Sequence, residues 1–581
     1  MASMRKQAFD LYCKSRNGEI ESSIAEFDSL INDANNSGEG DSVDALVAKG
    51  YLACALFDCH PKPHSKSDAK QIFSDIFSSL CEVCDVEECC HVYMILGQCY
   101  FDGLGVPVDH VKGADLYGKS AGLSHSAAQC RLGYCYDMDK GVKKDFNEAA
   151  RLFRLAADQM YSPAVFNLGV CYEQGEGVVK DSSEACRLFR LAADQGYPGG
   201  IYSLAVCYDL GFGVEKDAVE ALRLYRLASD KGNSCAQCRL GVLFETGEGV
   251  PKDLKEAVRL YRLASAQGDM DGHCRLAVCL KEGLGVDLDI QAASRLFQIV
   301  AESGDPDAQT RLATCYLEGV GVPQDHEMAV YWYQLAAEQD DADAMARLAI
   351  CYSNGEGVSQ NLVKAAELYR ASAESGDSDA QCRLGACYET GDGVPHDMIQ
   401  AAAWYLKSAD SGYPYAQYRL GVCFELGSGV NQNLEKAVEW FQKSSDQNYP
   451  EGMCRLALCY LSGNGVEENA EEAFRLLSKS APGGDTSSQY YLGWCYENGQ
   501  GVGTDLVEAG RWYKVAAEQD DPFALFALGR MHELGGGDFN VDIVEAMRYF
   551  KRAAALDHEI TITHILTLTD IYKEEVRFLL I

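Results

Sequence analysis

The sequence has few of the features that mark membrane, secreted or nucleic-acid-binding proteins. It contains no run of the roughly 18 consecutive apolar residues that a membrane-spanning helix requires. Residues 1–12 contain Arg5, Lys6 and Asp10 and no continuous apolar stretch, so we expect no secretory signal there. A formal net charge of −36, with no Lys/Arg-rich run, disfavours a phosphate backbone as partner. We therefore expect a cytoplasmic protein that binds no nucleic acid and does not insert into membranes.

Motifs of catalysis and cofactor binding are also missing. We find no His-Glu-x-x-His, no Gly-x-Ser-x-Gly and no phosphate-loop motif, and the 11 histidines follow no common register. Gly-x-Gly pairs such as Gly175 and Gly177 are frequent, but they lack the third glycine of a dinucleotide fingerprint and follow helical patterns rather than strands. The sequence thus predicts no enzyme activity and no cofactor, and a small-molecule ligand is not expected.

What the sequence does contain is a repeat of 36 residues. Its anchor is the small residue Gly97 within the segment Leu96–Val106. A glycine or alanine recurs every 36 residues after it, without an insertion, at Gly133, Gly169, Ala205, Gly241, Ala277, Ala313, Ala349, Gly385, Gly421, Ala457, Gly493 and Gly529. Thirteen units in one phase indicate a single repeat architecture that shares its core between neighbours.

Each unit has the pattern of two helices joined by a tight corner. Small and apolar residues recur at helical spacing around the anchor, as in Ala128, Leu132 and Cys135. A Gly-x-Gly-Val loop follows, in which glycine can take the left-handed conformation that ends a helix. In the second helical run, such as 256–265, a small residue precedes a large aromatic one by four positions, here Tyr261. One hairpin cannot bury such faces alone, so we predict an all-α solenoid of stacked α/α hairpins.

The pattern Leu-Gly-x-x-Tyr-x-x-Gly-x-Gly-Val, followed by Ala-x-x-x-Tyr, resembles the Sel1-like repeat, a relative of the tetratricopeptide repeat. The resemblance covers residues 92–559 and implies a right-handed superhelix of about thirteen 36-residue repeats. The departures are small. Asp139 replaces the first loop glycine of the second repeat, and the last repeat carries Gly-Gly-Gly-Asp at 535–538 with one extra residue before its second helix.

This resemblance implies a non-enzymatic scaffold or adaptor whose solenoid surface binds and assembles partner proteins or peptide segments. Some cysteine-rich members of the family are associated with a hydrolytic, β-lactamase-like role, which stays as the alternative. Such members pair cysteines between the two helices of a repeat, whereas the second helical runs of this chain offer little beyond Cys186.

Two regions flank the repeats. Residues 560–581, with a helical pattern from Ile565, are predicted to form a C-terminal capping helix. Residues 1–91 are interpreted as an N-terminal helical cap of degenerate repeats, since the terminal units of a stacked array have no neighbour on one side. Its helical candidates are 20–34, 43–57 and 69–80.

Eleven of the 25 cysteines recur at one position of the first helix, two residues after the anchor. Equivalent positions of stacked helices lie about 8–10 Å apart or farther, beyond the roughly 7 Å between Cα atoms that a disulfide spans. We interpret these cysteines as small buried side chains. A separate cluster, Cys81, Cys84, Cys89, Cys90 and His91, has the residue types of a zinc site. Its second half is cramped, so thiols buried on capping helices are favoured and we predict no metal.

The best candidate for a binding site is an arginine two residues before the anchor. It occurs at Arg131, Arg239, Arg275, Arg311, Arg347, Arg383, Arg419 and Arg455. First helices line the inner face in the family that the chain resembles, where guanidinium groups are suited to grip carboxylates or backbone carbonyls of an extended protein segment. The favoured alternative is that each arginine is neutralised by a carboxylate in its own or the adjacent repeat.

Overall fold

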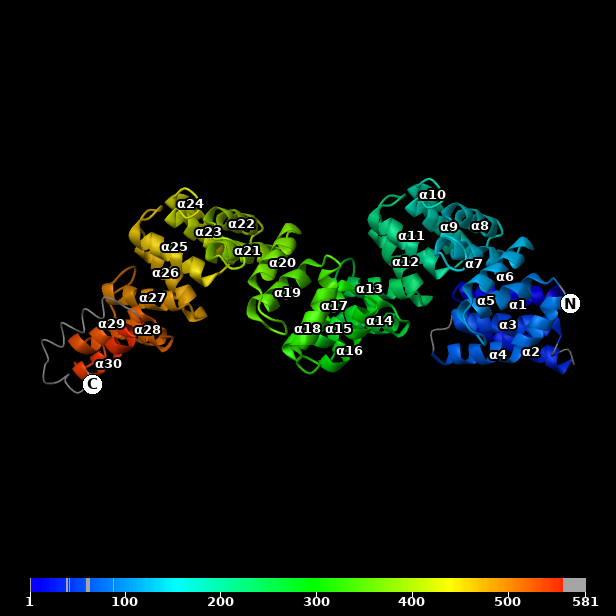
Figure 1. Cartoon of the computed structure of the whole chain (residues 1–581), viewed down its shortest axis with the longest axis horizontal. Coiled ribbons are helices and arrows are strands. Elements are labelled where there is room, and N and C mark those ends of the chain that lie inside the picture. Colours follow the sequence, from blue (N-terminus) through cyan, green and yellow to red (C-terminus); the bar gives the residue numbers. More distant parts are fainter. Residues whose placement is uncertain (1, 38–39, 41, 59–62, 87, 557–581) are drawn as a thin grey trace. The chain divides into compact units, whose positions relative to one another are not determined.

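The computed structural model describes residues 2–37, 40, 42–58, 63–86 and 88–556. Over these ranges the ordered elements are helices, and the extended pairing is limited to a single β-bridge between Gly536 and Phe539. The all-α fold class predicted from the sequence is therefore confirmed (Figure 1). None of the helices in the described part of the chain combines the length and the apolar run needed to cross a bilayer. The capping helix predicted for 560–581 lies outside the described residues.

A series of α/α hairpins makes up most of the chain. The first helices of the hairpins are α5 (Cys90–Asp102), α7 (Ser126–Asp137), α9 (Ser162–Gln174), α11 (Pro198–Leu210), α13 (Ser234–Thr246), α15 (Met270–Glu282), α17 (Pro306–Glu318), α19 (Ala342–Asn354), α21 (Ser378–Thr390), α23 (Pro414–Leu426), α25 (Pro450–Ser462), α27 (Thr486–Asn498) and α29 (Pro522–Leu534). The second helices are α6 (His110–Gly122), α8 (Phe146–Ala157), α10 (Ser182–Asp194), α12 (Ala218–Asp230), α14 (Leu254–Ala266), α16 (Ile290–Glu302), α18 (His326–Ala337), α20 (Leu362–Glu374), α22 (Met398–Asp410), α24 (Leu434–Asp446), α26 (Ala470–Ser480, continued by the short 3₁₀ helix Ala481–Gly483), α28 (Leu506–Glu518) and α30 (Ile543–Ala554).

The hairpins are grouped in two compact units. The first extends to Ser303 and includes the loop Val320–Val322, and the second comprises Gly304–Gly319 and the chain from Pro323 onward. Within each unit, first helices of neighbouring repeats contact one another, as α7 does α9, α13 does α15 and α23 does α25, whereas second helices do not meet to the same extent. The first helices therefore lie on the inner side of the curve of each unit.

The small anchor residue is required by the aromatic ring of its own second helix. A Cβ added to Gly241 would lie 2.5 Å from the ring of Tyr261, and one added to Gly385 would lie 2.8 Å from the ring of Tyr405. Both tyrosines are fully buried. The close approach of helix to ring is the interdigitated packing that the repeat pattern predicts.

The two glycines of each corner have different surroundings. The first ends its helix in the left-handed conformation, with φ of 83° at Gly175. The second also has positive φ, and a Cβ added to Gly177 would lie 2.0 Å from the carbonyl oxygen of Phe146, which begins α8 of the preceding repeat. The corner of one repeat is thus pressed against the hairpin before it. At the departure in the second repeat, Asp139 itself adopts positive φ, 54°, which an aspartate tolerates.

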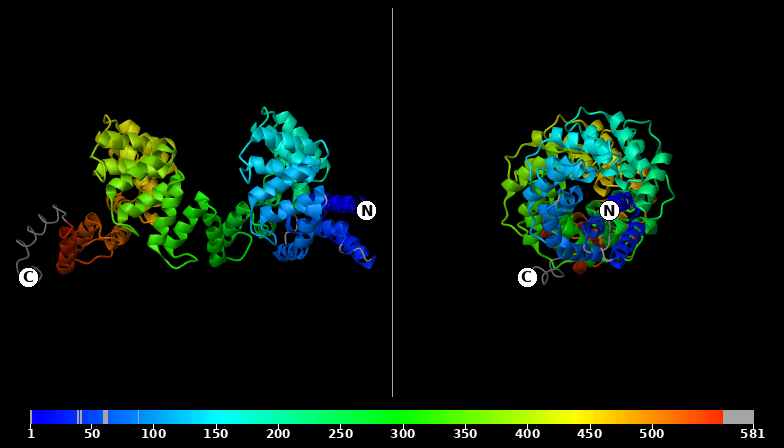
Figure 2. Two further views of the ribbon diagram at one scale, coloured as in Figure 1. Left: turned by 45° about the vertical axis from the view of Figure 1, so that its right-hand side comes forward. Right: turned by 90° about the vertical axis from the view of Figure 1, so that its right-hand side faces the viewer.

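Four helices precede the first repeat. They are α1 (Ala2–Arg16), α2 (Ile20–Asn36), α3 (Val43–Asp58) and α4 (Pro63–Val86). The last three lie where the sequence pattern indicates helices, whereas α1 has no counterpart among the predicted helices. In Figure 2 these N-terminal helices, in dark blue, lie against the first hairpins. The α3/α4 hairpin contacts α5, and α1 packs mainly on α3 and α2.

Candidate functional site

The eight arginines of the column lie on first helices. Arg131 belongs to a buried cluster around Asp58, and each of the other seven has a carboxylate partner. In four repeats the partner belongs to the first helix of the preceding repeat: Arg239 pairs with Asp209, Arg275 with Glu245, Arg419 with Glu389 and Arg455 with Glu425. In three consecutive repeats the partner stands four residues earlier on the same helix: Arg311 pairs with Asp307, Arg347 with Asp343 and Arg383 with Asp379. Each of these seven arginines is thus paired within its own or the adjacent repeat.

In the first group, the carboxylate can also accept a hydrogen bond from a tyrosine of the second helix. Tyr405 donates to Glu389 at 2.6 Å, and Glu389 pairs with Arg419, whose side chain is 24% exposed. Burial, followed by the hydrogen bond to Glu389, raises the pKa of Tyr405, so its hydroxyl keeps the proton that it donates. Tyr225, Asp209 and Arg239 form the same arrangement. These arginines tie neighbouring repeats together.

The carboxylates of the second group are more exposed than those of the first. The side chains of Arg311, Arg347 and Arg383 are 43%, 42% and 44% exposed, and those of their partners Asp307, Asp343 and Asp379 are 58%, 57% and 37% exposed. Ion pairs this exposed contribute about 0–1 kcal/mol. A carboxylate or carbonyl of a bound segment can therefore replace the aspartate at little cost. Helices α17, α19 and α21 present three such guanidinium groups in a row.

A feature that the sequence analysis did not anticipate is that α1 lies across the first-helix side of the first unit. Phe9 meets His125 edge-on, with ring centroids 4.7 Å apart, and stacks on Tyr161 at 6.4 Å. Past the end of α1, the Nζ of Lys231 donates to the carbonyl oxygen of Asn17 at 3.0 Å. These contacts take α1 across the beginnings of α7 and α9, so part of this surface is occupied by the chain itself.

Asp58, the last residue of α3, connects α1 to the repeats. Its carboxylate accepts hydrogen bonds from Tyr12 at 3.0 Å and from Gln98 at 3.1 Å, and it pairs with Arg16 and Arg131. The side chain is only 7% exposed. Burial alone would raise the pKa of Asp58, but the charges of Arg131 and Arg16 outweigh burial and hold the pKa below its usual value. Arg131, the first arginine of the column, is therefore committed to this buried cluster.

His91, one of the metal candidates, belongs to a polar cluster beneath α1. The hydroxyl of Tyr51 lies 2.7 Å from Nδ1 of His91 and 2.8 Å from Nε2 of His125. Burial, with the charge of Arg5 second, lowers the pKa of His91 to about 4. Burial, with His91 second, lowers the pKa of His125 to about 3. Both imidazoles are therefore neutral at pH 7.

Acidification is expected to loosen α1. Since the pKa values of His91 and His125 are lowered in the folded state, their stabilising effect is complete above about pH 6.5, the value for an unfolded chain, and is lost as the pH falls towards 4. Arg5, Asp44 and Tyr51 face the pair. Because each histidine takes up a proton when α1 opens, we expect hydrogen-exchange protection of α1 to fall by up to roughly a hundredfold per pH unit between about pH 6.5 and pH 4. A variant with His91 and His125 both changed to glutamine should lose this pH dependence. If protection falls with the same slope in that variant, the histidines are not its source.

The other metal candidates are spread over two helices. Cys81 and Cys84 lie on α4, Cys90 begins α5, and Cys89 precedes α5 and accepts a hydrogen bond from Arg5 at 3.5 Å. Among the described residues, no three His, Cys, Asp or Glu side chains are placed to hold a metal ion together.

The cysteines of the repeated column are buried, apart from the half-buried Cys387. Burial, as the main cause, raises the pKa of Cys135 to about 12 and that of Cys423 to about 11. A thiol with so high a pKa is a poor nucleophile at neutral pH. Cys186 and Cys207 hydrogen-bond to each other, but they belong to neighbouring repeats. The described cysteines thus show no pairing between the two helices of one repeat, which is the arrangement that the hydrolase alternative requires.

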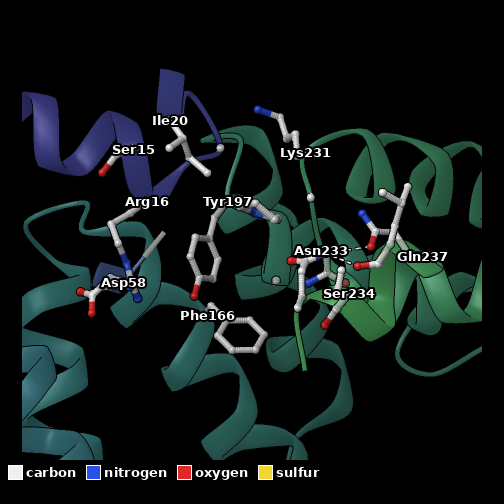
Figure 3. A pocket seen from close by; sticks show the side chains of 17 residues that line it. Ser15, Arg16, Ile20, Asp58, Phe166, Tyr197, Lys231, Asn233, Ser234 and Gln237 are labelled. Carbon is white, nitrogen blue, oxygen red and sulfur yellow. Dashed lines mark hydrogen bonds and ion pairs between the residues drawn. The ribbon is translucent and has the colours of Figure 1, made fainter. Parts of the chain in front are cut away.

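Two cavities flank the end of α1. The larger, of about 610 Å³, is bordered by Arg16, Tyr197, Lys231 and Asn233 (Figure 3). The ring of Tyr197, which precedes α11, stands between Arg16 and Asn233. The smaller, of about 320 Å³, is lined by Arg16, Arg131 and Tyr197 among others. The surface next to α1 is therefore hollowed and rich in hydrogen-bonding groups.

The family profile described as Sel1 repeat matches thirteen successive stretches of the chain. They are 92–125, 126–159, 162–197, 198–233, 236–269, 271–305, 306–341, 342–377, 378–413, 414–449, 450–485, 486–521 and 522–558. The chain belongs to the Sel1 repeat family. Each Sel1 repeat coincides with one hairpin, from α5/α6 to α29/α30, which confirms the resemblance drawn from the repeat pattern.

Solved structures include other Sel1 repeat proteins. A protective antigen present in uropathogenic Escherichia coli strains, which displays an SLR fold, is 32% identical over 76% of this chain and 93% of its own, with a TM-score of 0.59. A Sel1 repeat protein from Oxalobacter formigenes is 26% identical over 53% of this chain and 90% of its own, with a TM-score of 0.41. Among curated proteins no sequence matches this Sel1 repeat chain.

Proposed function

We propose that this Sel1 repeat protein is a non-enzymatic, cytoplasmic scaffold that binds segments of partner proteins along the first-helix face of its repeats. The observation that carries the proposal is the row Arg311, Arg347 and Arg383. Their side chains are about two-fifths exposed, and their partners Asp307, Asp343 and Asp379 are 58%, 57% and 37% exposed. The hydrolase alternative has no comparable observation in its favour.

The row suits an extended protein segment for a geometric reason. Stacked first helices lie about 10 Å apart, which matches about three residues of extended chain at 3.3 Å each. A guanidinium group donates to carboxylate or backbone carbonyl oxygens with fixed geometry. One turn along the same helices, Thr314, Ile350 and Ala386 are half-buried side chains of modest size.

Capture from an extract of the protein's own cells tests the proposal. The wild-type chain is compared with a variant in which Arg311, Arg347 and Arg383 are all changed to glutamine, and bound proteins are quantified by mass spectrometry. Glutamine removes the charge without placing a second carboxylate beside Asp307, Asp343 or Asp379. We expect the variant to lose at least tenfold of a small set of proteins that the wild type retains.

The matched control removes three arginines from second helices of the same unit. Arg475, Arg511 and Arg548 are 63%, 69% and 65% exposed, and each pairs with a glutamate three residues earlier on its own helix. A variant with these three changed to glutamine has the same change in net charge and should capture the wild-type set. Equal losses in both variants, or no enriched protein with the wild type, would contradict the proposal.

A further inference from the structure

In most repeats the residue that precedes the first helix is an aspartate or asparagine. Its side chain caps the helix by accepting a hydrogen bond from a backbone N–H of the first turn. Asp305, Asp341 and Asp377 are examples. Four first helices have a tyrosine there instead, with no side-chain cap, namely Tyr161, Tyr197, Tyr413 and Tyr449. Losing such a cap costs about 0.5–2 kcal/mol. A locally unfavourable residue at a repeated position points to a role for the ring outside the hairpin.

In the first unit that role is visible, because these tyrosines face α1. Phe9 stacks on Tyr161, and Arg16 lines a cavity together with Tyr161 and Tyr197 while it pairs with Asp58 at 3.4 Å. Helix α1 is basic within an acidic protein. It carries Arg5, Lys6, Lys14 and Arg16 against the single acidic residue Asp10. The uncapped tyrosines of the first unit thus form part of a seat for a basic amphipathic helix.

The second unit presents a similar set of rings. Tyr449 lies 6.1 Å from both Tyr415 and Tyr418, measured between ring centroids, and all three are half-buried. Together with Tyr491 of α27 we call these residues the tyrosine patch. The helices that carry or border the patch, α23, α25 and α27, contact mainly helices of their own and adjacent repeats.

A cavity of about 160 Å³ opens within the patch. Tyr418 and Tyr491 line it, together with the carboxylates of Glu451 and Asp485. Arg455 also lines the cavity. Its charge is offset by Glu425, which lies 3.7 Å away and is not part of the cavity lining. The cavity therefore combines two aromatic rings with two carboxylates, as the seat of Arg16 combines Tyr161 and Tyr197 with Asp58.

We propose that the tyrosine patch binds a basic amphipathic helix of a partner protein, with an arginine of that helix in the cavity between Tyr418 and Tyr491. A guanidinium group is attracted to the faces of tyrosine rings, and the two carboxylates neutralise its charge. The net charge of −36 steers a basic partner towards the chain. This inference rests on the proposed function in that both assign protein binding to the first-helix face, but it involves none of Arg311, Arg347 and Arg383.

The test uses a fluorescent synthetic peptide of residues 2–18, titrated with the full chain and followed by anisotropy. The chain's own α1 occupies the corresponding surface of the first unit, so the added peptide probes the tyrosine patch. We expect saturable binding with a Kd on the order of 10 μM. The variants Glu451→Gln and Tyr491→Ser should each weaken binding at least fivefold. Glu439→Gln, an exposed carboxylate on the second helix α24, is the matched control and should leave binding unchanged.

Three results would overturn the inference. The first is that the peptide does not bind the wild-type chain. The second is that it binds the Glu451→Gln and Tyr491→Ser variants as tightly as the wild type. The third is that a peptide whose four basic residues are replaced by glutamate binds as tightly as the original peptide. Sedimentation of the full chain tests the remaining alternative, that a second copy of this chain occupies the tyrosine patch. Self-association that needs both residues 2–18 and Glu451 would assign the patch to a second copy, against the proposal.

The two proposals can fail separately. The variant with Arg311, Arg347 and Arg383 changed to glutamine should bind the peptide as the wild type does. If capture depends on those arginines while the peptide does not bind, only the further inference is lost. If the peptide binds through Glu451 while capture is unaffected by the three arginines, only the role of the arginine row is lost.

Discussion

Replacement of Asp58 by alanine is expected to lower the free energy of unfolding of the first unit by about 3–5 kcal/mol. The change would leave Arg131 and Arg16 without the carboxylate that they share, and would remove the acceptor of the Tyr12 and Gln98 hydrogen bonds. A buried charge without its partner is costly because the low-polarity surroundings no longer compensate the loss of water. Urea unfolding measures the loss, and hydrogen exchange of α1 locates it.

Two further variants separate the buried cluster from ordinary surface ion pairs. Asp307→Ala removes the exposed partner of Arg311 and should cost less than about 1 kcal/mol. Changing Asp58 and Arg131 together to leucine should restore part of the loss, since replacing a buried ion pair by apolar groups is often close to neutral. A loss at Asp58→Ala no greater than that at Asp307→Ala would show that the cluster does not hold α1.

The second large effect is expected at a corner glycine. Gly177→Ala should cost about 3 kcal/mol or more, because alanine is strained at φ of 68° and its Cβ would lie 2.0 Å from the carbonyl oxygen of Phe146. The preceding hairpin would have to move away from the corner, and two repeats would lose part of their shared packing. The urea midpoint of the first unit reports this loss.

The chain supplies a matched control for this substitution. Gly249 occupies the same place in its own corner, with φ of 71°, but no atom lies within 4 Å of the position of an added Cβ. Gly249→Ala should therefore cost only the backbone strain, about 1–2 kcal/mol. Similar losses at the two positions would mean that the corner does not lock the repeats together.

The hairpins could be predicted from the sequence because every repeat has the same local pattern of small, aromatic and glycine residues. A small residue such as Gly241 stands opposite a ring such as that of Tyr261, and the corner glycines end the first helix, so thirteen copies reinforce one reading. The pairing of the arginines is also local. For Arg347 and Arg383, the position of the preceding first helix that would hold a carboxylate is occupied by Leu317 and Ser353. In these repeats an aspartate stands four residues before the arginine instead.

The position of α1 could not be predicted in this way. Its contacts join residues far apart in sequence, such as Phe9 with His125 and Arg16 with Asp58, and no periodicity marks them. One signal was present at the beginnings of the first helices. Tyr161 and Tyr197 replace the capping aspartate or asparagine of other repeats, and such a departure from a repeated rule indicates a contact outside the repeat.

Protein binding by the first-helix face can be tested by site-specific photocrosslinking. A photoreactive amino acid is placed at Ser353 on α19, on the half-buried side next to the arginine row, and in a separate chain at Glu367 on the exposed side of α20. We expect a discrete crosslinked partner from position 353 in native extract, lost on competition with unlabelled chain, and none from position 367. Crosslinks from position 367 alone would place binding on the second-helix face and contradict binding by the first-helix face.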